Sequence, residues 1–537
     1  MTQVSAPGQT GAHEPVDNAQ GTNEQVADER AVGAVAPPVP PLQWRDKKRY
    51  LWLLGLIPPT AVFLATGFIV LGNWVGHQLD WAWMQHATPI WWWIGPILIY
   101  GLLPILDRFF GPDGQNPPDE LIEQLENDKY YRYCTYAYIP FQLVSLVIAA
   151  YLWTAGPGGR FGDLSWMGID SGSLSLISKI GLAISIGAMG GIGINTAHEL
   201  GHKKVSMERW LSKVTLAQTA YGHFYIEHNR GHHVRVATPE DPASSRFGET
   251  FWGFLPRSVF GSLKSAWELE ANRMKRLDRP VFHPSNDVLN AWVMTVVLWG
   301  ALAGLFGWQV LPFLVIQAIY GFSLLEAVNY LEHYGLLRQQ NKRGRYERCT
   351  PEHSWNSDHI ATNIFLYHLQ RHSDHHANPT RRYQTLRSFS EAPSLPSGYA
   401  SMISLTYFPP LWRKIMDKRV IEHYDGDLTR ANLQPGQEAK LLAKYGQAPR
   451  GASDGERPAR EPRPTPVVAR DTRNDEAANT EAALAYCCPN CEYVYRVAQG
   501  APREGFGAGT PWSAISDDWA CPDCGVREKI DFVVIGA

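Results

Sequence analysis

Six apolar stretches, each close to the length of a bilayer crossing, constrain this chain more than any other feature. A membrane-spanning helix needs about 20 predominantly apolar residues, and backbone inside the hydrocarbon must satisfy its own hydrogen bonds as a helix or a closed barrel. The stretches cover approximately residues 50–71, 90–110, 137–154, 177–197, 288–308 and 310–331. The sequence therefore predicts an all-α polytopic membrane protein with six transmembrane helices.

The distribution of Lys and Arg orients these helices. Lys47, Lys48 and Arg49 precede the first stretch, the loop 72–89 contains neither residue type, and the segment 203–287 is rich in both. Because cytoplasmic loops carry the excess of Lys and Arg, we expect both termini and the polar segments after the fourth and sixth stretches to lie in the cytoplasm.

Three short histidine-rich boxes lie in those polar segments. They are His198-Glu-Leu-Gly-His202, His228-Asn-Arg-Gly-His232-His233 and His372-Ser-Asp-His375-His376. On an α-helix, His228 and His232 share a face, with His233 about 100° further round, and the third box spans an arc of about 100°. Imidazole suits iron, zinc, copper and nickel, and eight imidazoles exceed one tetrahedral site. We therefore predict two metal ions in one histidine-rich site, held by a helical cytoplasmic cap.

The sixth apolar stretch carries polar residues on one face. Glu326, Asn329 and His333 follow one another at helical spacing, and polar groups near bilayer depth are usually functional. The alternative role is hydrogen bonding between helices. For His333, which follows the membrane stretch where the boxes are expected to converge, we favour a ninth metal ligand.

Four cysteines mark a separate metal site near the end of the chain. Cys488-Pro-Asn-Cys491 and Cys521-Pro-Asp-Cys524 are two CxxC knuckles. Four thiolates in this pattern favour tetrahedral iron or zinc. Cys487 does not fit the spacing and is expected to remain a free thiol.

Composition divides the chain into four parts. We expect a disordered leader over 1–44, a membrane domain over 45–425, a flexible linker over 426–485 and a small metal-binding domain over 486–537. The net charge of −3 gives no electrostatic footprint for nucleic acid, so no nucleic-acid partner is expected. The acidic tail is expected to be attracted to a basic face of the cap that contains Arg381 and Arg382.

The boxes HELGH, EHNRGHH and LQRHSDHH, together with NYLEHYGL at 329–336, resemble the integral-membrane alkane 1-monooxygenase family. That family belongs to a histidine-box group that also contains membrane desaturases and hydroxylases. The tail sequences YCCPNCEYVY and PWSAISDDWACPDCG are similar to rubredoxin. The chain thus looks like a fusion of the two. Glu492 stands where rubredoxins usually have Gly, so we expect backbone strain there.

The resemblance implies a di-iron site of two non-haem irons, O₂ as co-substrate and one iron in an FeS₄ centre of the rubredoxin domain. The implied di-iron ligands are His198, His202, His228, His232, His233, His333, His372, His375 and His376, and the implied FeS₄ ligands are Cys488, Cys491, Cys521 and Cys524. Four carboxylates are candidate partners for the N–H groups of ligand histidines, with ordinary ion pairing as an equal alternative: Glu199, Glu332, Asp358 and Asp374.

The resemblance also implies an activity and its partners. It implies terminal hydroxylation of medium-to-long linear alkanes to 1-alkanols, with electrons from the fused rubredoxin. A flavin-dependent NAD(P)H rubredoxin reductase would supply electrons to the rubredoxin domain. The location implied is a bacterial-type inner (cytoplasmic) membrane, with several crossings and with the metal sites on the cytoplasmic side.

Three other functions fit parts of the sequence. HELGH satisfies the HExxH signature of zinc proteases, with Glu199 as general base, but a zinc protease needs only three protein ligands. A histidine-box desaturase or fatty-acyl hydroxylase would use the same boxes. A membrane protein that stores or transports metal, with a zinc-ribbon tail, is the non-enzymatic alternative.

Overall fold

A computed structural model describes residues 44–342, 344–446, 485–517 and 519–535. The expected leader, except for its last residue, lies outside the described residues, and so does most of the expected linker. The chain divides into a unit 1–45 and a compact unit 46–537, and the description below concerns the second unit.

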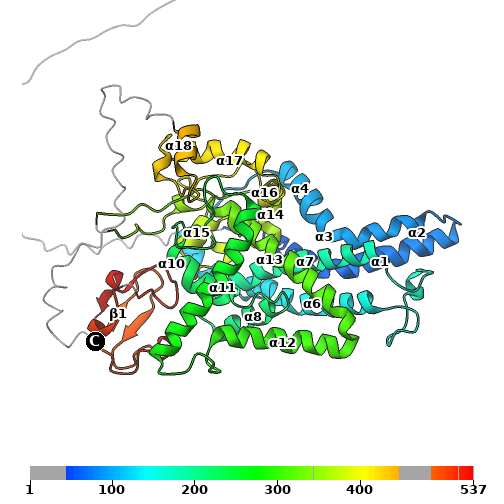
Figure 1. Cartoon of the computed structure of the whole chain (residues 1–537), viewed down its shortest axis with the longest axis horizontal. Helices are drawn as coiled ribbons and strands as arrows, with labels where there is room; N and C mark the ends of the chain where they lie inside the picture. The colour runs from blue at the N-terminus through cyan, green and yellow to red at the C-terminus, as the bar shows by residue number, and fades with distance from the viewer. Residues whose placement is uncertain (1–43, 343, 447–484, 518, 536–537) are drawn as a thin grey trace, which may run out of the picture. The chain divides into compact units, whose positions relative to one another are not determined.

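Six helical segments of the described residues are long and apolar enough to cross a membrane, which confirms the predicted number. They are Leu51–Gln78, Met84–Phe110, Lys129–Thr154, Leu176–Gly201, Asp287–Phe306 and Trp308–His333. Within them lie α1 (Ile57–Gln78), α2 (Met84–Ala87), α3 (Ile94–Pro96), α4 (Leu103–Phe110), α6 (Lys129–Thr154), α7 (Leu176–Gly201), α12 (Asp287–Phe306) and α13 (Leu311–His333). Figure 1 shows α1, α6, α7 and α12 running in the same general direction.

Side-chain caps determine where several of these helices begin. Asp128, Ser175 and Asn286 each accept a backbone N–H from the first turn of α6, α7 and α12, respectively. Such caps satisfy donors that have no partner inside the helix. From its start after Ser175, α7 continues unbroken for 26 residues. It therefore carries His198 of the first histidine box in its last turn.

Glycines allow α7 to pack closely against α13, as the Gly-rich sequence of the fourth apolar stretch predicts. A Cβ on Gly191 would lie 2.8 Å from the carbonyl oxygen of Gly321, and a Cβ on Gly187 would lie 2.6 Å from that of Gln317. Neither distance is compatible with a side chain. The two helices that carry His198 and His333 are thus held in backbone contact.

Further helices form the polar cap. They are α5 (Ile122–Asn127), α8 (Ser206–Ala217), α9 (Phe224–Glu227), α10 (His233–Arg235), α11 (Phe251–Arg276), α14 (Ile360–Phe365), α15 (His372–Ala377), α16 (Tyr399–Thr406), α17 (Pro409–His423) and α18 (Glu438–Tyr445). Large buried aromatic side chains, among them Trp355, Trp412 and Tyr399, form its core.

Residues 426–446 were expected to belong to the flexible linker, but they fold against the cap. They include α18, and the backbone of Asn432 accepts a hydrogen bond from the N–H of Phe247 and donates one to the carbonyl oxygen of Gly335. The Leu441 side chain lies against Gly248, where it would meet a Cβ at 2.8 Å. The segment is rich in polar and charged residues, so its composition predicted a linker. Its few apolar side chains are nevertheless enough to pack it against the cap.

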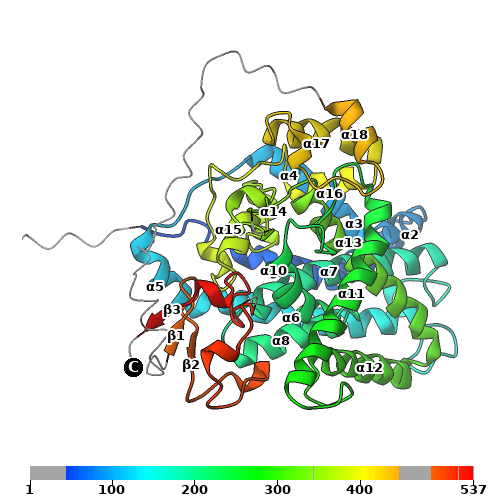
Figure 2. The same cartoon turned by 60° about the vertical axis from the view of Figure 1, so that its left-hand side comes forward.

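The described part of the tail, which we call the tail module (485–535), contains a small antiparallel sheet. Its strands β1 (Ala485–Cys487), β2 (Val494–Arg496) and β3 (Val533–Ile535) have the order β2-β1-β3 (Figure 2). Tyr486 pairs with Tyr495 on one side and with Val534 on the other. Tyr486 also stacks on Trp512 at 4.1 Å between ring centroids, so aromatic packing forms the core beside the four cysteines.

Candidate metal centre

Nine histidines from four stretches of the chain converge in two adjoining groups. The first group is His198, His202, His228, His233 and His375, and the second is His232, His333, His372 and His376. In each group the potential ligand atoms all lie within 4.8 Å of one another. All nine side chains are buried, at most 7% exposed. Every histidine proposed from the sequence is therefore in the centre.

The second box divides between the two groups because its backbone is not an ordinary α-helix. Residues His228–His232 form a π-helical turn, in which the N–H of His233 donates to the carbonyl oxygen of His228. This i→i+5 bond inserts one residue into the turn. His228 and His233 therefore share the first group, with their Nε2 atoms 3.1 Å apart, and His232 points to the second. The rings of His228 and His232 still lie 5.1 Å apart, but they belong to different groups.

The third box also serves both groups. His372 and His376, four residues apart on α15, belong to the second group, and their Nε2 atoms are 2.8 Å apart. His375 belongs to the first group, with its Nε2 atom 2.7 Å from that of His198. His333, at the end of α13, joins the second group, and its ring lies 5.2 Å from that of His372. The short arc of the third box therefore straddles the boundary between the groups.

The donor set fits a pair of metal ions. Nitrogen ligands about 2.1 Å from one ion lie about 3–4 Å from each other, close to the 2.7–3.2 Å between neighbouring Nε2 atoms. Both ring nitrogens of His333 and Nε2 of His202 have no hydrogen-bond partner although they are buried. Burial also lowers the pKa of His228, His233 and His375 well below the usual value, so these rings are neutral, the form in which imidazole can bind a metal.

The two groups are neighbours rather than separate sites. The rings of His233 and His376, one from each group, have centroids 4.4 Å apart at an interplanar angle of 35°. The rings of His375 and His376 are 5.7 Å apart. Two ions bound here would share one compact, buried centre made mainly of imidazoles.

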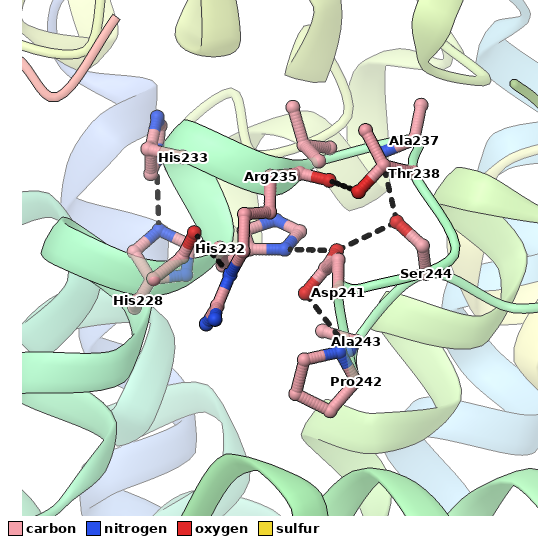
Figure 3. A network of polar contacts seen from close by, with 12 residues as sticks. His228, His232, His233, Arg235, Ala237, Thr238, Asp241, Pro242, Ala243 and Ser244 are labelled. Carbon is pink, nitrogen blue, oxygen red and sulfur yellow. Dashed lines mark hydrogen bonds and ion pairs between the residues drawn. The ribbon is translucent and has the colours of Figure 1, made fainter. Parts of the chain in front are cut away.

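Asp241 is the clearest functional residue that the sequence did not reveal (Figure 3). Its Oδ2 atom lies 2.8 Å from Nδ1 of His232 and accepts a hydrogen bond from the Ser244 hydroxyl at 2.6 Å. Burial would raise the pKa of Asp241, but these contacts outweigh it and hold the pKa below its usual range. An ionised carboxylate fixes Nδ1 as the protonated nitrogen and leaves Nε2 for the metal. The only sequence signal is an acid a few residues after the box.

Of the four acidic candidates, only Glu332 contacts a histidine of the centre. Its Oε2 atom lies 3.2 Å from Nε2 of His372, the nitrogen that faces His376, so the carboxylate is directed toward the middle of the second group.

The other three candidates are engaged in ion pairs. Glu199 binds Lys203, Asp358 binds Arg371, and Asp374 binds Arg381. For these three the alternative of ordinary ion pairing describes the structure.

The four predicted cysteines of the tail module converge as a third group. Sγ of Cys488 lies 3.8 Å from that of Cys524, and Sγ of Cys491 lies 3.5 Å from that of Cys521. This spacing suits four thiolates around one tetrahedral ion with bonds of about 2.3 Å. Glu492 has φ +61°, the left-handed conformation that favours glycine, as its position in the knuckle predicted.

The tail module contacts the segments that carry the histidine boxes. Lys204, two residues after His202, donates to the carbonyl oxygen of Cys491. Arg230, inside the second box, pairs with Glu504 at 2.7 Å. Gly525, next to a cysteine ligand, packs so closely that a Cβ there would lie 2.8 Å from the carbonyl oxygen of Asn229 and 3.5 Å from the Cβ of His233.

The tail module contacts a different part of the cap from the basic face that was expected to attract it. Arg381 pairs with Asp374 at 2.7 Å, and Arg382 pairs with Glu208 at 2.9 Å. Both arginines are therefore neutralised by buried carboxylates. The tail module instead meets Lys204 and Arg230, so the predicted docking residues were wrong.

An apolar pocket lies directly beside the histidine centre. Its walls include Asn195, Val328 and Leu369. Asn195 lies three residues before His198 on α7, Leu369 lies three residues before His372, and Val328 lies five residues before His333 on α13. At 1.5 Å per helical residue, the pocket ends about one turn from the ligands.

Comparisons with known proteins agree with this geometry. Residues 177–406 match the family model described as fatty acid desaturase. Over 401 residues the chain is 48% identical to the alkane 1-monooxygenase of Acinetobacter baylyi, covering 75% of this chain and 92% of that protein. The chain belongs to the alkane 1-monooxygenase family. It is also 41% identical over 411 residues to the alkane 1-monooxygenase of Ectopseudomonas oleovorans, covering 76% of this chain and 95% of that protein.

The tail has relatives of its own. Residues 485–532 match the rubredoxin family model. Over 48 residues the chain is 73% identical to rubredoxin 3 of Rhodococcus erythropolis, which covers 9% of this chain and 79% of that protein. The predicted joining of an alkane 1-monooxygenase domain to a rubredoxin domain is therefore confirmed. Family membership disfavours the protease and metal-storage interpretations.

Proposed function

We propose that this chain hydroxylates the terminal methyl group of medium-to-long linear alkanes, using O₂ at two irons and electrons delivered by its own rubredoxin domain. The balanced reaction is RH + O₂ + 2e⁻ + 2H⁺ → ROH + H₂O. The observation that carries the proposal is the pair of adjoining all-histidine groups beside an apolar pocket. The identity of 40–48% to alkane 1-monooxygenases supports it.

The nine histidines would hold the two irons, five on one and four on the other. Bound iron would supply the one-electron redox chemistry that O₂ activation requires. The chain's own task is to fix the rings. The π-turn aims His228 and His233 at one ion and His232 at the other, and Asp241 holds the His232 tautomer through its 2.8 Å contact. Imidazole ligands leave the ions their positive charge, and burial excludes bulk water.

The pocket supports selectivity for a chain end. Its lining, apart from Asn195 and Thr362, is apolar, and the Asn195 side-chain amide already donates to the carbonyl oxygen of Leu366 at 2.7 Å. An alkane has no polar group to orient it, so shape alone positions the reacting carbon. A narrow apolar passage that ends one helical turn from the ligands presents a terminal methyl before any internal carbon.

The rubredoxin domain would deliver electrons singly, because an FeS₄ centre carries one at a time. Its contacts with Lys204 and Arg230 support transfer into the segments that carry the first and second boxes. Tethering to the same chain raises its effective concentration. A flavin-dependent NAD(P)H reductase would recharge it between the two transfers.

We also propose that the metal centre faces the cytoplasm of a bacterial-type inner membrane. The excess of Lys and Arg in the segment 203–287, against none in the loop 72–89, supports this orientation. A reporter that works only in the cytoplasm should be active when fused to the C-terminus. Activity of a reporter that works only in the periplasm, fused at the same place, would contradict the orientation.

The decisive experiment combines a metal count with a product assay on purified full-length protein. We expect about two irons per chain in the membrane domain and one in the tail. With a linear alkane, ¹⁸O₂ and a reductase, the product should be a 1-alkanol carrying ¹⁸O. His375→Ala should abolish the product, whereas His86→Ala, at an exposed histidine outside the centre, should not.

The same experiment separates the alternatives. An alkene product would assign the chain to desaturation, the other activity of the histidine-box group. A single zinc without hydroxylation would favour a protease. A colourless tail would indicate zinc rather than ferric FeS₄.

A further inference from the structure

A second apolar space opens at the surface near the inner pocket. This surface groove has a volume of about 880 Å³, within the range of ligand sites. Trp252, Ile319 and Phe408 line it and are 57%, 51% and 59% exposed. Ile319 lies on the membrane-spanning α13, so the groove faces the hydrocarbon that surrounds such a helix.

Three tyrosines of the surface groove are near neighbours along the chain of residues that line the inner pocket. Tyr100, Tyr320 and Tyr407 line the groove. On the same three elements, Ile99, Leu324 and Ile403 line the inner pocket, one to four residues away from those tyrosines. The same three elements therefore line both spaces, and we call the three residues the tyrosine triad.

Hydrogen bonds join the triad. The Tyr100 hydroxyl lies 2.7 Å from that of Tyr320 and 3.1 Å from that of Tyr407. The rings of Tyr100 and Tyr407 also meet edge to face, with centroids 6.0 Å apart. Tyr100 stands in a π-helical turn, Ile97–Leu102, an irregularity often found at functional sites. These contacts tie the second membrane segment to α13 and to the end of α16.

The inner pocket is small in this arrangement. Its free volume is about 30 Å³, against about 880 Å³ for the surface groove. A linear chain of several carbons cannot occupy it unless lining side chains move. The surface groove, by contrast, is open at full width. A moving element is therefore needed between the two spaces, and the triad lies on the three elements that line both.

We propose that Tyr100, Tyr320 and Tyr407 form a gate through which the linear hydrocarbon passes from the bilayer into the inner pocket, and through which the alcohol returns. The inference rests on the proposed function for the identity of the hydrocarbon. Opening breaks only two neutral hydrogen bonds, each of which contributes little net stability. The rings shield the histidine centre from lipid and water while the gate is closed.

The triad can also form hydrogen bonds with the alcohol product, which the alkane substrate cannot do. Three hydroxyls carry three protons, and two are used within the triad, so one O–H and several lone pairs remain to bind another hydroxyl. An alkane gains nothing from these groups. A primary alcohol leaving the centre exchanges hydrogen bonds with them, so the gate favours exit of product over its retention in an apolar pocket.

Photolabelling tests the gate without relying on turnover. A linear alkane with a terminal diazirine is added to the full-length protein in lipid nanodiscs, irradiated, and mapped by peptide mass spectrometry. In the wild type we expect labels both on groove residues such as Ile319 and on pocket residues such as Leu324. In Tyr320→Trp, which enlarges the gate ring, pocket labelling should fall about tenfold while groove labelling remains. Equal pocket labelling in a folded Tyr320→Trp would overturn the gate.

A second variant guards against misfolding. Tyr100→Phe removes both hydrogen bonds but keeps the ring, and we expect pocket labelling to rise and alkanol release to slow. The matched control is Tyr133→Phe, at a 59% exposed tyrosine of α6 outside the groove, which should change neither. Unchanged labelling and release in Tyr100→Phe would also refute the gate. If labelling follows these expectations but no alkanol forms, the gate stands and the proposed function fails.

Discussion

Replacing Asp241 with Asn isolates the contribution of one carboxylate to the second histidine group. Asp241 is 1% exposed and accepts three hydrogen bonds: from His232 and Ser244 at Oδ2, and from the backbone N–H of Ala243 at Oδ1. Asn keeps the size of the side chain and one acceptor. If that oxygen stays on Ala243, an NH₂ group faces both the His232 ring and the Ser244 hydroxyl.

The structure sets the size of the effect. A hydrogen bond to an ionised group contributes about 1.5–3 kcal/mol, and removing the partner that orients a ligand histidine typically costs about 10–100-fold in metal affinity. We therefore expect iron affinity at the group of His232, His333, His372 and His376 to fall about 10–100-fold. The group of five, which does not contain His232, should retain its iron.

Chelator competition on detergent-purified protein measures this directly as iron retained per chain. The Asp241→Asn protein should lose one membrane-domain iron at a chelator concentration that leaves the wild type loaded. Asp107→Asn is the matched control, because Asp107 is equally buried but accepts its hydrogen bonds from Thr362. If Asp241→Asn kept both irons as firmly as the wild type, the assignment of Asp241 as the residue that orients His232 would be wrong.

Three further predictions concern the tail module and the cap. Cys521→Ser should stop reductase-driven turnover, and added external rubredoxin should restore it; failure of this rescue would mean that the tail does more than carry electrons. Glu492→Gly should stabilise the tail module by about 0.5–1 kcal/mol, because φ is +61° there; a lower guanidinium midpoint for loss of its visible absorbance would contradict the strain. Burial lowers the pKa of His353, but hydrogen bonds to Cys349 and Glu347 outweigh it and raise the pKa to about 9 from the ordinary 6.5. The stabilisation from protonated His353 is therefore complete below pH 6.5 and lost as pH rises through 9. The Tm of the wild type should fall more steeply over this pH range than the Tm of His353→Gln. Parallel slopes of Tm against pH would contradict the raised pKa of His353.

Local chemistry was enough to predict the building blocks of this protein. A run of about 20 apolar residues has few alternatives to a membrane helix, so the six spans followed from composition alone. Residue type likewise predicted that these nine histidines and four cysteines come together in metal-binding groups, because few other side chains bind such metals. The left-handed Glu492 followed from comparison with the glycine usual in its place.

Only the tertiary structure decided how those blocks are used. Whether His232 or His233 joins His228 depends on one backbone hydrogen bond, the i→i+5 bond of a π-turn, which residue spacing does not encode. Asp241 reaches His232 through a loop. Arg381 and Arg382 were predicted to attract the acidic tail because their buried partners, Asp374 and Glu208, cannot be identified from the sequence. Pairings of this kind depend on which distant segments pack together, and that is fixed by the whole core rather than by any one stretch of the chain.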